Sequence, residues 1–263
     1  MRLPRPQIEQ CCVHVAHRCQ ERRFLLRFAN DRRQYRLRLF EAIQRFPLVN
    51  ILDYVITSNH VHLLAWVRRM QDLSDMMHWL QGVAAQDANR RKKREGSFWR
   101  GRFHPTLVQT GRHLSRCLFY LDMNMVRAGV VDHPSDWAFG GAADLAGQRK
   151  RYRIIDQEQL LTCLGMPGQW EAFRTWHAAT LAELCAHPAT PVEPYWSSAF
   201  AVGTPTWLSG LGGGRINMAE YIEPVGDDGE NDLHALRLPQ SVAARLWRWL
   251  GCAKKSLKRI FCW

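Results

Sequence analysis

Two histidines two positions apart, His60 and His62, form the pattern in this sequence with the most specific chemistry. They lie in the apolar run 54–67, whose composition is typical of β-structure. Because side chains alternate between the two faces of a strand, both imidazoles would lie on one face, a few ångströms apart. Neutral imidazoles are common ligands of divalent metals, so the pair predicts half of a metal site. The alternative is two core histidines whose nitrogens are satisfied by hydrogen bonds.

A tyrosine and an amide, Tyr120 and Asn124, lie four positions apart in a second segment. Apolar residues at mostly helical spacing predict a helix over 111–127, which Gly129 would end. Four residues make about one helical turn, so the two side chains would share a face. A phenol with a pKa of about 10 attacks phosphate poorly at neutral pH, and a metal that polarises the phosphate makes the attack feasible. The amide oxygen of Asn124 could complete the coordination. The alternatives are a core tyrosine and a capping asparagine.

The elements that must position these residues follow a simple order in the first half of the chain. Strands are expected at 12–18, 50–57, 60–67 and 103–109, and helices at 31–46, 72–94 and 111–127. A tight turn at Ser58 and Asn59 makes His60 the first residue of a strand, at the rim of the sheet. The order is βαββαβ followed by a helix, which predicts an α+β, ferredoxin-like fold: an antiparallel sheet with helices on one face. Such a fold would bring the histidine strand and the tyrosine helix together.

Charge favours a nucleic-acid partner. The 263 residues carry a formal net charge of +12, and 46% of them are hydrophobic, which is enough for a buried core. An excess of cations favours polyanions such as DNA. The expected DNA contacts, through phosphates and through base stacking at the tryptophan, are Arg90, Arg91, Lys92, Lys93, Arg94, Trp99, Arg100 and Arg102. The alternative is a solvated helix end followed by a packed aromatic pair.

The sequence favours a cytoplasmic protein without a membrane partner. No stretch approaches the ~18 apolar residues that span a bilayer, and the first residues lack the apolar core of a signal peptide. The eight cysteines contain no CxxC pair and are expected to be reduced. Zinc binding by the cluster at 11–19 is disfavoured, because His14 and His17 would face opposite sides of a strand.

Two short motifs occur in an order and at a spacing that match a known family. The first is NHVHLL at 59–64, and the second is YLDMNMVRAGVV at 120–131. Between them, SFWRGRF at 97–103 is similar to the family's connecting segment. Together these segments resemble the REP-associated tyrosine transposases of the HUH superfamily of single-tyrosine, single-strand DNA transposases. The resemblance spans roughly residues 10–140, and the combination is specific where either motif alone is not.

This resemblance implies a site and a reaction. His60 and His62 would bind Mg²⁺ or Mn²⁺, with Asn124 as a third polar ligand. Tyr120 would attack a phosphate of single-stranded DNA, forming a 5′-phosphotyrosine bond and freeing a 3′-hydroxyl that can attack back to rejoin strands. Single-stranded or hairpin DNA is the expected partner, and the enzyme would be a monomer or a homodimer that exchanges the tyrosine helix. The family usually has proline where this chain has Met125. Proline would bend or end the helix, so Met125 would let it run on.

The rest of the chain is expected to be mostly helical. Gly140 and Gly141, with the polar run to 151, suggest a linker between a transposase domain at 1–140 and a C-terminal extension at 141–263 for accessory DNA binding or docking. The expected elements are helices at 156–164 and 168–186, an acidic mobile loop at 223–234 and a basic amphipathic helix over 245–259. We expect that last helix to dock on the core with its basic side toward DNA; contact with a membrane is the alternative.

Two other functions stay open on the sequence alone. A domesticated relative would bind DNA hairpins without cleaving them, and Met125 in place of proline keeps this alternative open. A nucleotide hydrolase of the histidine-triad kind would need a third alternating histidine, but position 64 is leucine.

Overall fold

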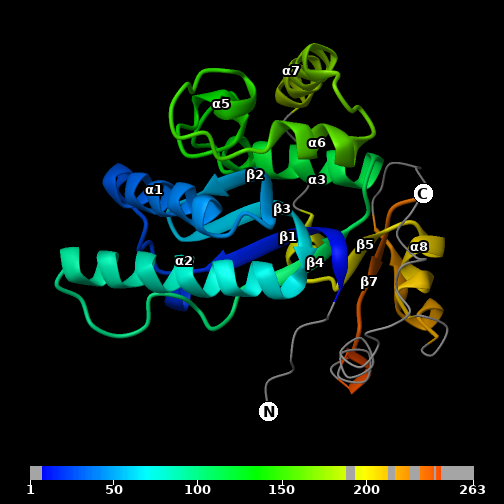
Figure 1. The fold of residues 1–263 in the computed structure, drawn as a ribbon, viewed down its shortest axis with the longest axis horizontal. Coiled ribbons are helices and arrows are strands. Elements are labelled where there is room, and N and C mark those ends of the chain that lie inside the picture. Colours follow the sequence, from blue (N-terminus) through cyan, green and yellow to red (C-terminus); the bar gives the residue numbers. More distant parts are fainter. Residues whose placement is uncertain (1–7, 188–192, 213–216, 226–231, 240, 244–263) are drawn as a thin grey trace.

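One sheet of seven strands forms the centre of the protein (Figure 1). The computed structural model describes residues 8–187, 193–212, 217–225, 232–239 and 241–243. The strands are β1 (Glu9–Arg18), β2 (Val49–Ile56), β3 (His60–Arg69), β4 (His104–Val108), β5 (Ala201–Gly203), β6 (Ile222–Pro224) and β7 (His234–Leu236). Their spatial order is β2-β3-β1-β4-β5-β7-β6, and every neighbouring pair is antiparallel except β4 and β5. The predicted α+β class is therefore confirmed.

The first four strands and two helices follow the predicted order along the chain. The helix α1 (Ala29–Arg45) connects β1 to β2, and α2 (Met70–Arg91) connects β3 to β4. Each of these elements begins and ends within three residues of its predicted bounds. The strand order places the histidine strand β3 between β2 and β1, inside the sheet.

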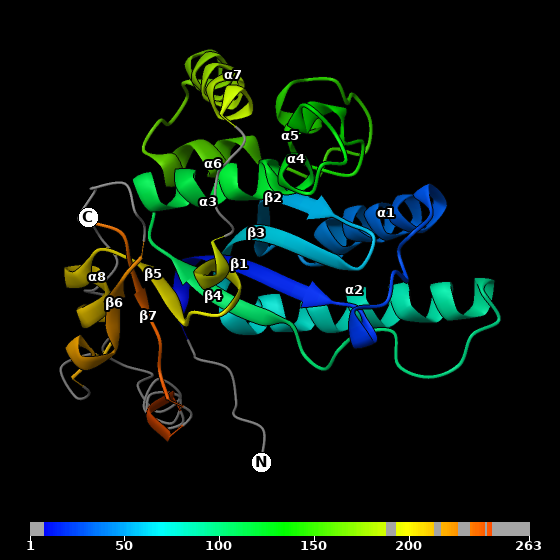
Figure 2. The same ribbon diagram turned by 180° about the vertical axis from the view of Figure 1, so that it is seen from behind.

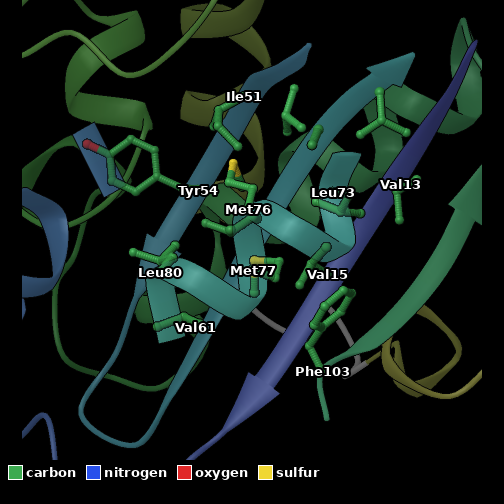
Figure 3. Close-up of a cluster of buried hydrophobic side chains, with 14 of the residues drawn as sticks. Val13, Val15, Ile51, Tyr54, Val61, Leu73, Met76, Met77, Leu80 and Phe103 are labelled. Atoms are coloured by element: carbon green, nitrogen blue, oxygen red, sulfur yellow. The ribbon is translucent and has the colours of Figure 1, made fainter. Parts of the chain in front are cut away.

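The face of the sheet beneath α2 is apolar. Val13 and Val15 of β1 and Val61 and Leu63 of β3 are fully buried there, because alternate residues of each strand point to this side. Figure 3 shows the residues of α2 that lie against these strands, namely Leu73, Met76, Met77 and Leu80. Their helical spacing gives α2 one apolar stripe, which is what allows the helix to pack along the sheet.

Helices also cover the opposite face, so the prediction of helices on one face only is wrong. The helices above the strands in Figure 1 are α3 (Arg112–Asp122), α6 (Gln157–Leu164) and α7 (Trp170–Ala186). Leu52 and Leu64 of the sheet pack in one buried cluster with Leu114 and Leu118 of α3. Strands covered on both sides are apolar at nearly every position, which explains the unbroken apolar runs of the sequence.

The described part of the C-terminal region contains the helices that the sequence predicts, together with three short strands that it does not predict. It contributes β5, β6 and β7 to the same sheet, with Ala201 beside Leu107 in the parallel pair, so the sheet continues across residue 140 (Figure 2). Three-residue strands are too short to produce an alternating pattern, which is why sequence analysis missed them. The predicted helices 156–164 and 168–186 correspond to α6 and α7.

The remaining elements are short. They are α4 (Asn124–Arg127), α5 (Ala142–Leu145), α8 (Pro205–Gly210) and the 3-10 turns η1 (Gln20–Arg22), η2 (Pro134–Asp136), η3 (Pro194–Ser197) and η4 (Ala219–Tyr221). The ends of the predicted acidic loop belong to β6 and β7, while 226–231 and the predicted tail helix 245–259 lie outside the described residues. Among the helices that the structure describes, none has both the length and the apolarity to cross a bilayer.

Candidate active site

His60 and His62 share one face of β3, as the strand spacing predicts. β3 begins at His60, and its register with β1 places Arg18 opposite His60 and Ala16 opposite His62. The centroids of the two imidazole rings are 4.9 Å apart, and the rings are nearly perpendicular. His62 is 2% exposed, whereas His60, at the end of the strand, is half-buried. The pair therefore extends from the rim of the sheet into its interior.

A chain of hydrogen bonds orients His62. His14 of β1 places Nδ1 2.6 Å from the carbonyl oxygen of Trp196 and Nε2 2.8 Å from Nδ1 of His62. A carbonyl oxygen only accepts, so Nδ1 of His14 carries the proton. Burial lowers the pKa of His14 to about 4, so the ring is neutral at pH 7 and its Nε2 accepts from Nδ1 of His62. Nε2 of His62 is left with the lone pair that a metal ligand requires.

His60 has the same tautomer as His62. Its Nδ1 lies 2.7 Å from Oδ1 of Asn59, an oxygen that only accepts, so Nδ1 donates and Nε2 carries the lone pair. Burial and, to a lesser extent, the charge of Arg18 lower the pKa of His60 to about 4. Burial, followed by the charges around it, lowers the pKa of His62 well below its ordinary value. Both imidazoles are thus neutral at pH 7 and carry their lone pairs on Nε2.

The ring of Tyr120 lies beside His62. Their ring centroids are 6.1 Å apart, and the centroids of His14 and Trp196 are each 6.2 Å from that of Tyr120. Tyr120 is 8% exposed, and its position on the apolar helix α3 explains this burial. Burial raises the pKa of Tyr120, while the charge of Arg127 and a hydrogen bond with Ser197 act in the opposite direction. The structure thus brings together the two histidines and the tyrosine that the sequence singles out.

Arg127 is a residue of this site that sequence analysis missed. Its guanidinium carbon lies 4.5 Å from the centroid of the Tyr120 ring, and Nη2 donates to the carbonyl oxygen of Tyr120 at 2.5 Å. A cation in this position favours the phenolate form of the tyrosine. The sequence contained a signal for Arg127. In the predicted helix 111–127 it follows Tyr120 by seven residues, which is about two helical turns and returns to the same face.

Arg18 is a second missed cation. It is exposed at the end of β1, directly across from His60, and its charge lowers the pKa of both His60 and His62. An arginine beside two candidate metal ligands is suited to bind a DNA phosphate. The signal in the sequence was that Arg18 is the last residue of the predicted strand 12–18, a position at the rim of the sheet like that of His60.

The helix that carries Tyr120 does not run on through Asn124. The helix α3 ends at Asp122, Met123 interrupts it, and α4 begins at Asn124. The prediction that Met125 lets the helix continue is therefore wrong, because the helix is already interrupted at Met123. Met125 itself is buried. Asn124 is half-buried at the start of α4, and its role as a metal ligand stays a prediction.

The donor set fits a divalent cation that accepts both nitrogen and oxygen ligands. Two neutral imidazoles with lone pairs on Nε2 suit Mn²⁺, whereas Mg²⁺ prefers oxygen ligands and keeps several waters. Among the residues that the structure describes, no three His, Cys, Asp or Glu side chains gather to hold a metal ion. A cation bound by His60 and His62 would complete its coordination with an amide, water or the phosphate oxygens of a substrate.

Several of the cations predicted to bind DNA have structural partners. Arg91 and Lys92 form ion pairs with buried Asp31, at 2.5 and 2.7 Å. Arg94 donates to the carbonyl oxygen of Ser97 at 2.7 Å. The two ion pairs tie the end of α2 to the first turn of α1. Four of the predicted cations are exposed, namely Arg90, Lys93, Arg100 and Arg102. Contact of this group with DNA stays a prediction.

Trp99 is a core residue. It is 7% exposed, its indole N–H donates to the carbonyl oxygen of Gln81 at 3.0 Å, and its ring stacks on His17 with a centroid distance of 4.7 Å. The predicted base stacking by Trp99 is therefore wrong for this conformation, because neighbouring side chains cover the ring. His17 lies here on the α2 face while His14 lies on the α3 face, so the prediction that the two diverge is confirmed. The six cysteines in the described part of the chain are free thiols.

Known proteins are similar to this chain over its first half. Residues 7–122 match the family described as "Transposase IS200 like", a stretch that contains His60, His62 and Tyr120. No curated protein matches the chain. One solved structure, "Structure of the REP associates tyrosine transposase bound to a REP hairpin", is similar with 17% sequence identity and a TM-score of 0.46. The similarity covers 59% of this chain and 94% of that one.

Proposed function

We propose that this protein is a metal-dependent endonuclease and strand transferase for single-stranded DNA, and the match of residues 7–122 to the family described as "Transposase IS200 like" supports this proposal. The observation that carries the proposal is the juxtaposition of the Tyr120 ring, 6.1 Å from His62, with a histidine pair whose rings are 4.9 Å apart. We also propose that the unit β1-α1-β2-β3-α2-β4 is ferredoxin-like, which the sheet order β2-β3-β1-β4 supports.

The reaction exchanges one phosphoester bond for another. The Oη of Tyr120 attacks the phosphorus, a P–Oη bond forms and the P–O3′ bond breaks. The phenol proton is released and the departing 3′ oxygen takes up a proton as a hydroxyl. The reverse attack by a 3′-hydroxyl restores a DNA strand, so no external energy source is needed. A Mg²⁺ or Mn²⁺ ion bound by His60, His62 and Asn124 would polarise the scissile phosphate.

The protein's own residues have three tasks in this step. His14 and Asn59 hold the two metal-ligating imidazoles in the required tautomers. Arg127 favours the phenolate of Tyr120, opposing the burial that raises the pKa of this tyrosine. Arg18 binds the phosphate beside His60. The net charge of +12 and the motifs at 59–64 and 120–131 support single-stranded or hairpin DNA as the substrate.

A covalent-adduct assay tests the proposal. Labelled hairpin DNA with single-stranded flanks is incubated with the protein and Mn²⁺ and separated on a denaturing gel. We expect a shifted band that is lost in Tyr120→Phe and after chelation of the metal. Tyr152→Phe, at an exposed tyrosine, is the matched control and should keep the band. A band that survives in Tyr120→Phe would mean that another residue is the nucleophile.

A second candidate function is hairpin binding without cleavage. The burial of Tyr120 and its raised pKa favour this alternative, because a buried neutral phenol is a poor nucleophile. It predicts tight hairpin binding by both the parent protein and Tyr120→Phe, with no adduct at any concentration of Mn²⁺ or Mg²⁺. The same gel, run beside a binding assay, separates the two functions.

A further inference from the structure

Two phenylalanines on the segment between β1 and α1 point away from the core. Phe24 and Phe28 are each 64% exposed, the highest values among the large hydrophobic residues that the structure describes. Exposed apolar area costs free energy, at about 25 cal/mol per Å², so an occupant that covers the rings would be favoured. We call residues 19–28 the aromatic loop. Its other exposed side chains include Arg22, Arg23 and Arg27, and the guanidinium carbon of Arg27 lies 5.9 Å from the ring centroid of Phe28.

One side of the aromatic loop is fixed to the β2–β3 turn that precedes His60. The N–H of Leu26 donates to the carbonyl oxygen of Ser58 at 2.9 Å. The side-chain amide of Asn59 donates to the carbonyl oxygen of Arg22 at 3.1 Å, and the Oδ1 of the same side chain accepts from Nδ1 of His60 at 2.7 Å. A single asparagine side chain thus connects the aromatic loop to a candidate metal ligand.

The backbone near this connection has an uncommon conformation. Arg22 has a φ of 56°, and Glu21 before it has a φ of 54°. Such values are uncommon for residues other than glycine, and two in succession need support from surrounding contacts. The hydrogen bond from Asn59 supplies support at Arg22.

The other side of the aromatic loop is fixed to the end of α2. The buried carboxylate of Asp31 accepts from the N–H of Phe28 at 3.3 Å and pairs with Arg91 and Lys92. The Nζ of Lys92 also donates to the carbonyl oxygen of Leu25 at 2.5 Å and lies 5.9 Å from the ring centroid of Phe28. The two rings are therefore presented on a loop held at both ends, which reduces the entropy lost when a ligand binds.

We propose that Phe24 and Phe28 form a stacking platform for unpaired bases next to the metal site. Aromatic rings stack on the π-face of any base, and the surrounding arginines bind the phosphates between the bases. The charge of the aromatic loop favours a polyanion as the occupant: its three exposed arginines oppose docking of a second copy of this chain, whose net charge is also +12. The proposal rests on the proposed function and specifies where the single strand beside the cleaved phosphate lies.

Fluorescence anisotropy with a short single-stranded thymidine oligonucleotide tests the platform. We expect Phe24→Ala/Phe28→Ala to lower the affinity about tenfold or more, because stacking contributes roughly 1–3 kcal/mol per base. The slope of log affinity against log salt should stay unchanged, since no phosphate contact is removed. Phe24→Trp/Phe28→Trp should retain binding, and Leu48→Ala, at another exposed apolar residue, should have no effect.

An abasic oligonucleotide of the same length gives the sharpest control, because it keeps the phosphates and lacks the rings. The parent protein and the double alanine variant should bind it equally. The platform would be overturned if the parent protein and the double alanine variant bound the thymidine oligonucleotide with equal affinity, or if the variant lost the same affinity for both oligonucleotides. It would also be overturned if the substitutions changed the sedimentation coefficient of the protein without DNA, because the two rings would then contact another copy of the chain. The adduct assay reports on the proposed function separately. If the parent protein forms the adduct and the Phe24 and Phe28 substitutions do not change its affinity for single strands, only the platform is excluded. If the parent protein neither binds single strands nor forms an adduct, both the platform and the proposed function are excluded.

Discussion

The two faces of β1 and β3 carry different chemistry, although their residues alternate along the same backbone. Toward α2, Val13, Val15 and Leu63 are fully buried in an apolar cluster. Toward α3, His14 and His62 are just as buried, but they form a hydrogen-bonded chain that ends on the carbonyl of Trp196. A buried polar group without a partner costs about 1–3 kcal/mol, so this chain of bonds makes the polar face tolerable.

The α3 face contains further buried polar groups. His177 of α7 bonds Asp122 of α3 at 2.7 Å. Asp53 of β2 is fully buried. Burial, followed by the charge of Asp122, raises the pKa of Asp53 well above its ordinary value. The face toward α2 therefore stabilises the fold through apolar packing. The face toward α3 is less favourable for stability, because it buries polar groups in fixed positions.

The largest expected effect comes from the polar face. His62→Ala should abolish the Mn²⁺-dependent adduct, because it removes the imidazole that we propose as a metal ligand next to Tyr120. Manganese electron paramagnetic resonance should show a matching loss of bound metal. A variant with parental metal binding and adduct yield would show that His62 is only a core histidine.

The neighbouring residue on the same strand provides the opposite case. Leu63→Ala should lower the free energy of unfolding by about 3 kcal/mol, since a fully buried leucine leaves a cavity in the apolar cluster. At a temperature where the variant is folded, its Mn²⁺ affinity should equal that of the parent. Urea denaturation measures the first quantity and paramagnetic resonance the second. Loss of metal affinity in Leu63→Ala would mean that the two faces are not independent.

Acid should destabilise the protein through the α3 face. Burial lowers the pKa of His14 to about 4, against about 6.5 in an unfolded chain, so protonation favours unfolding. The stability is complete above pH ~6.5 and falls as the pH drops toward 4, by on the order of 3 kcal/mol from His14 alone. His14→Leu should reduce this acid-induced loss in urea titrations at pH 7 and 4.5. An identical pH dependence in that variant would exclude His14 as the source.

The smallest effect concerns the connection between His14 and His62. At pH 7, His14→Leu should weaken Mn²⁺ binding about tenfold, because His62 then loses the acceptor that holds its tautomer. Nitrogen chemical shifts of the His62 ring, measured by nuclear magnetic resonance, should change from one tautomer to a mixture. Retained tautomer and affinity would assign the orientation of His62 to packing alone.

Most helices and strands of the first half of the protein, and two helices of the second, are predictable from the residue pattern. Strand alternation placed His60 and His62 on one face, and helical periodicity found α1, α2, α6 and α7 close to their observed bounds. These predictions succeed because alternation and helical spacing are properties of neighbouring residues. Trp99 shows the limit of this reasoning, since an aromatic residue beside cations has the same local pattern whether it is buried or exposed.

The chemical groups of the site follow from the order of the residues: two histidines at strand spacing, a tyrosine on an amphipathic helix, and an excess of cations. The contacts between these groups depend on the folded chain. His14 reaches His62 across 48 positions and Trp196 across 182, and Lys92 pairs with Asp31 across 61. Which buried donor meets which acceptor depends on how the sheet and helices pack, and no periodicity of neighbouring residues carries that information.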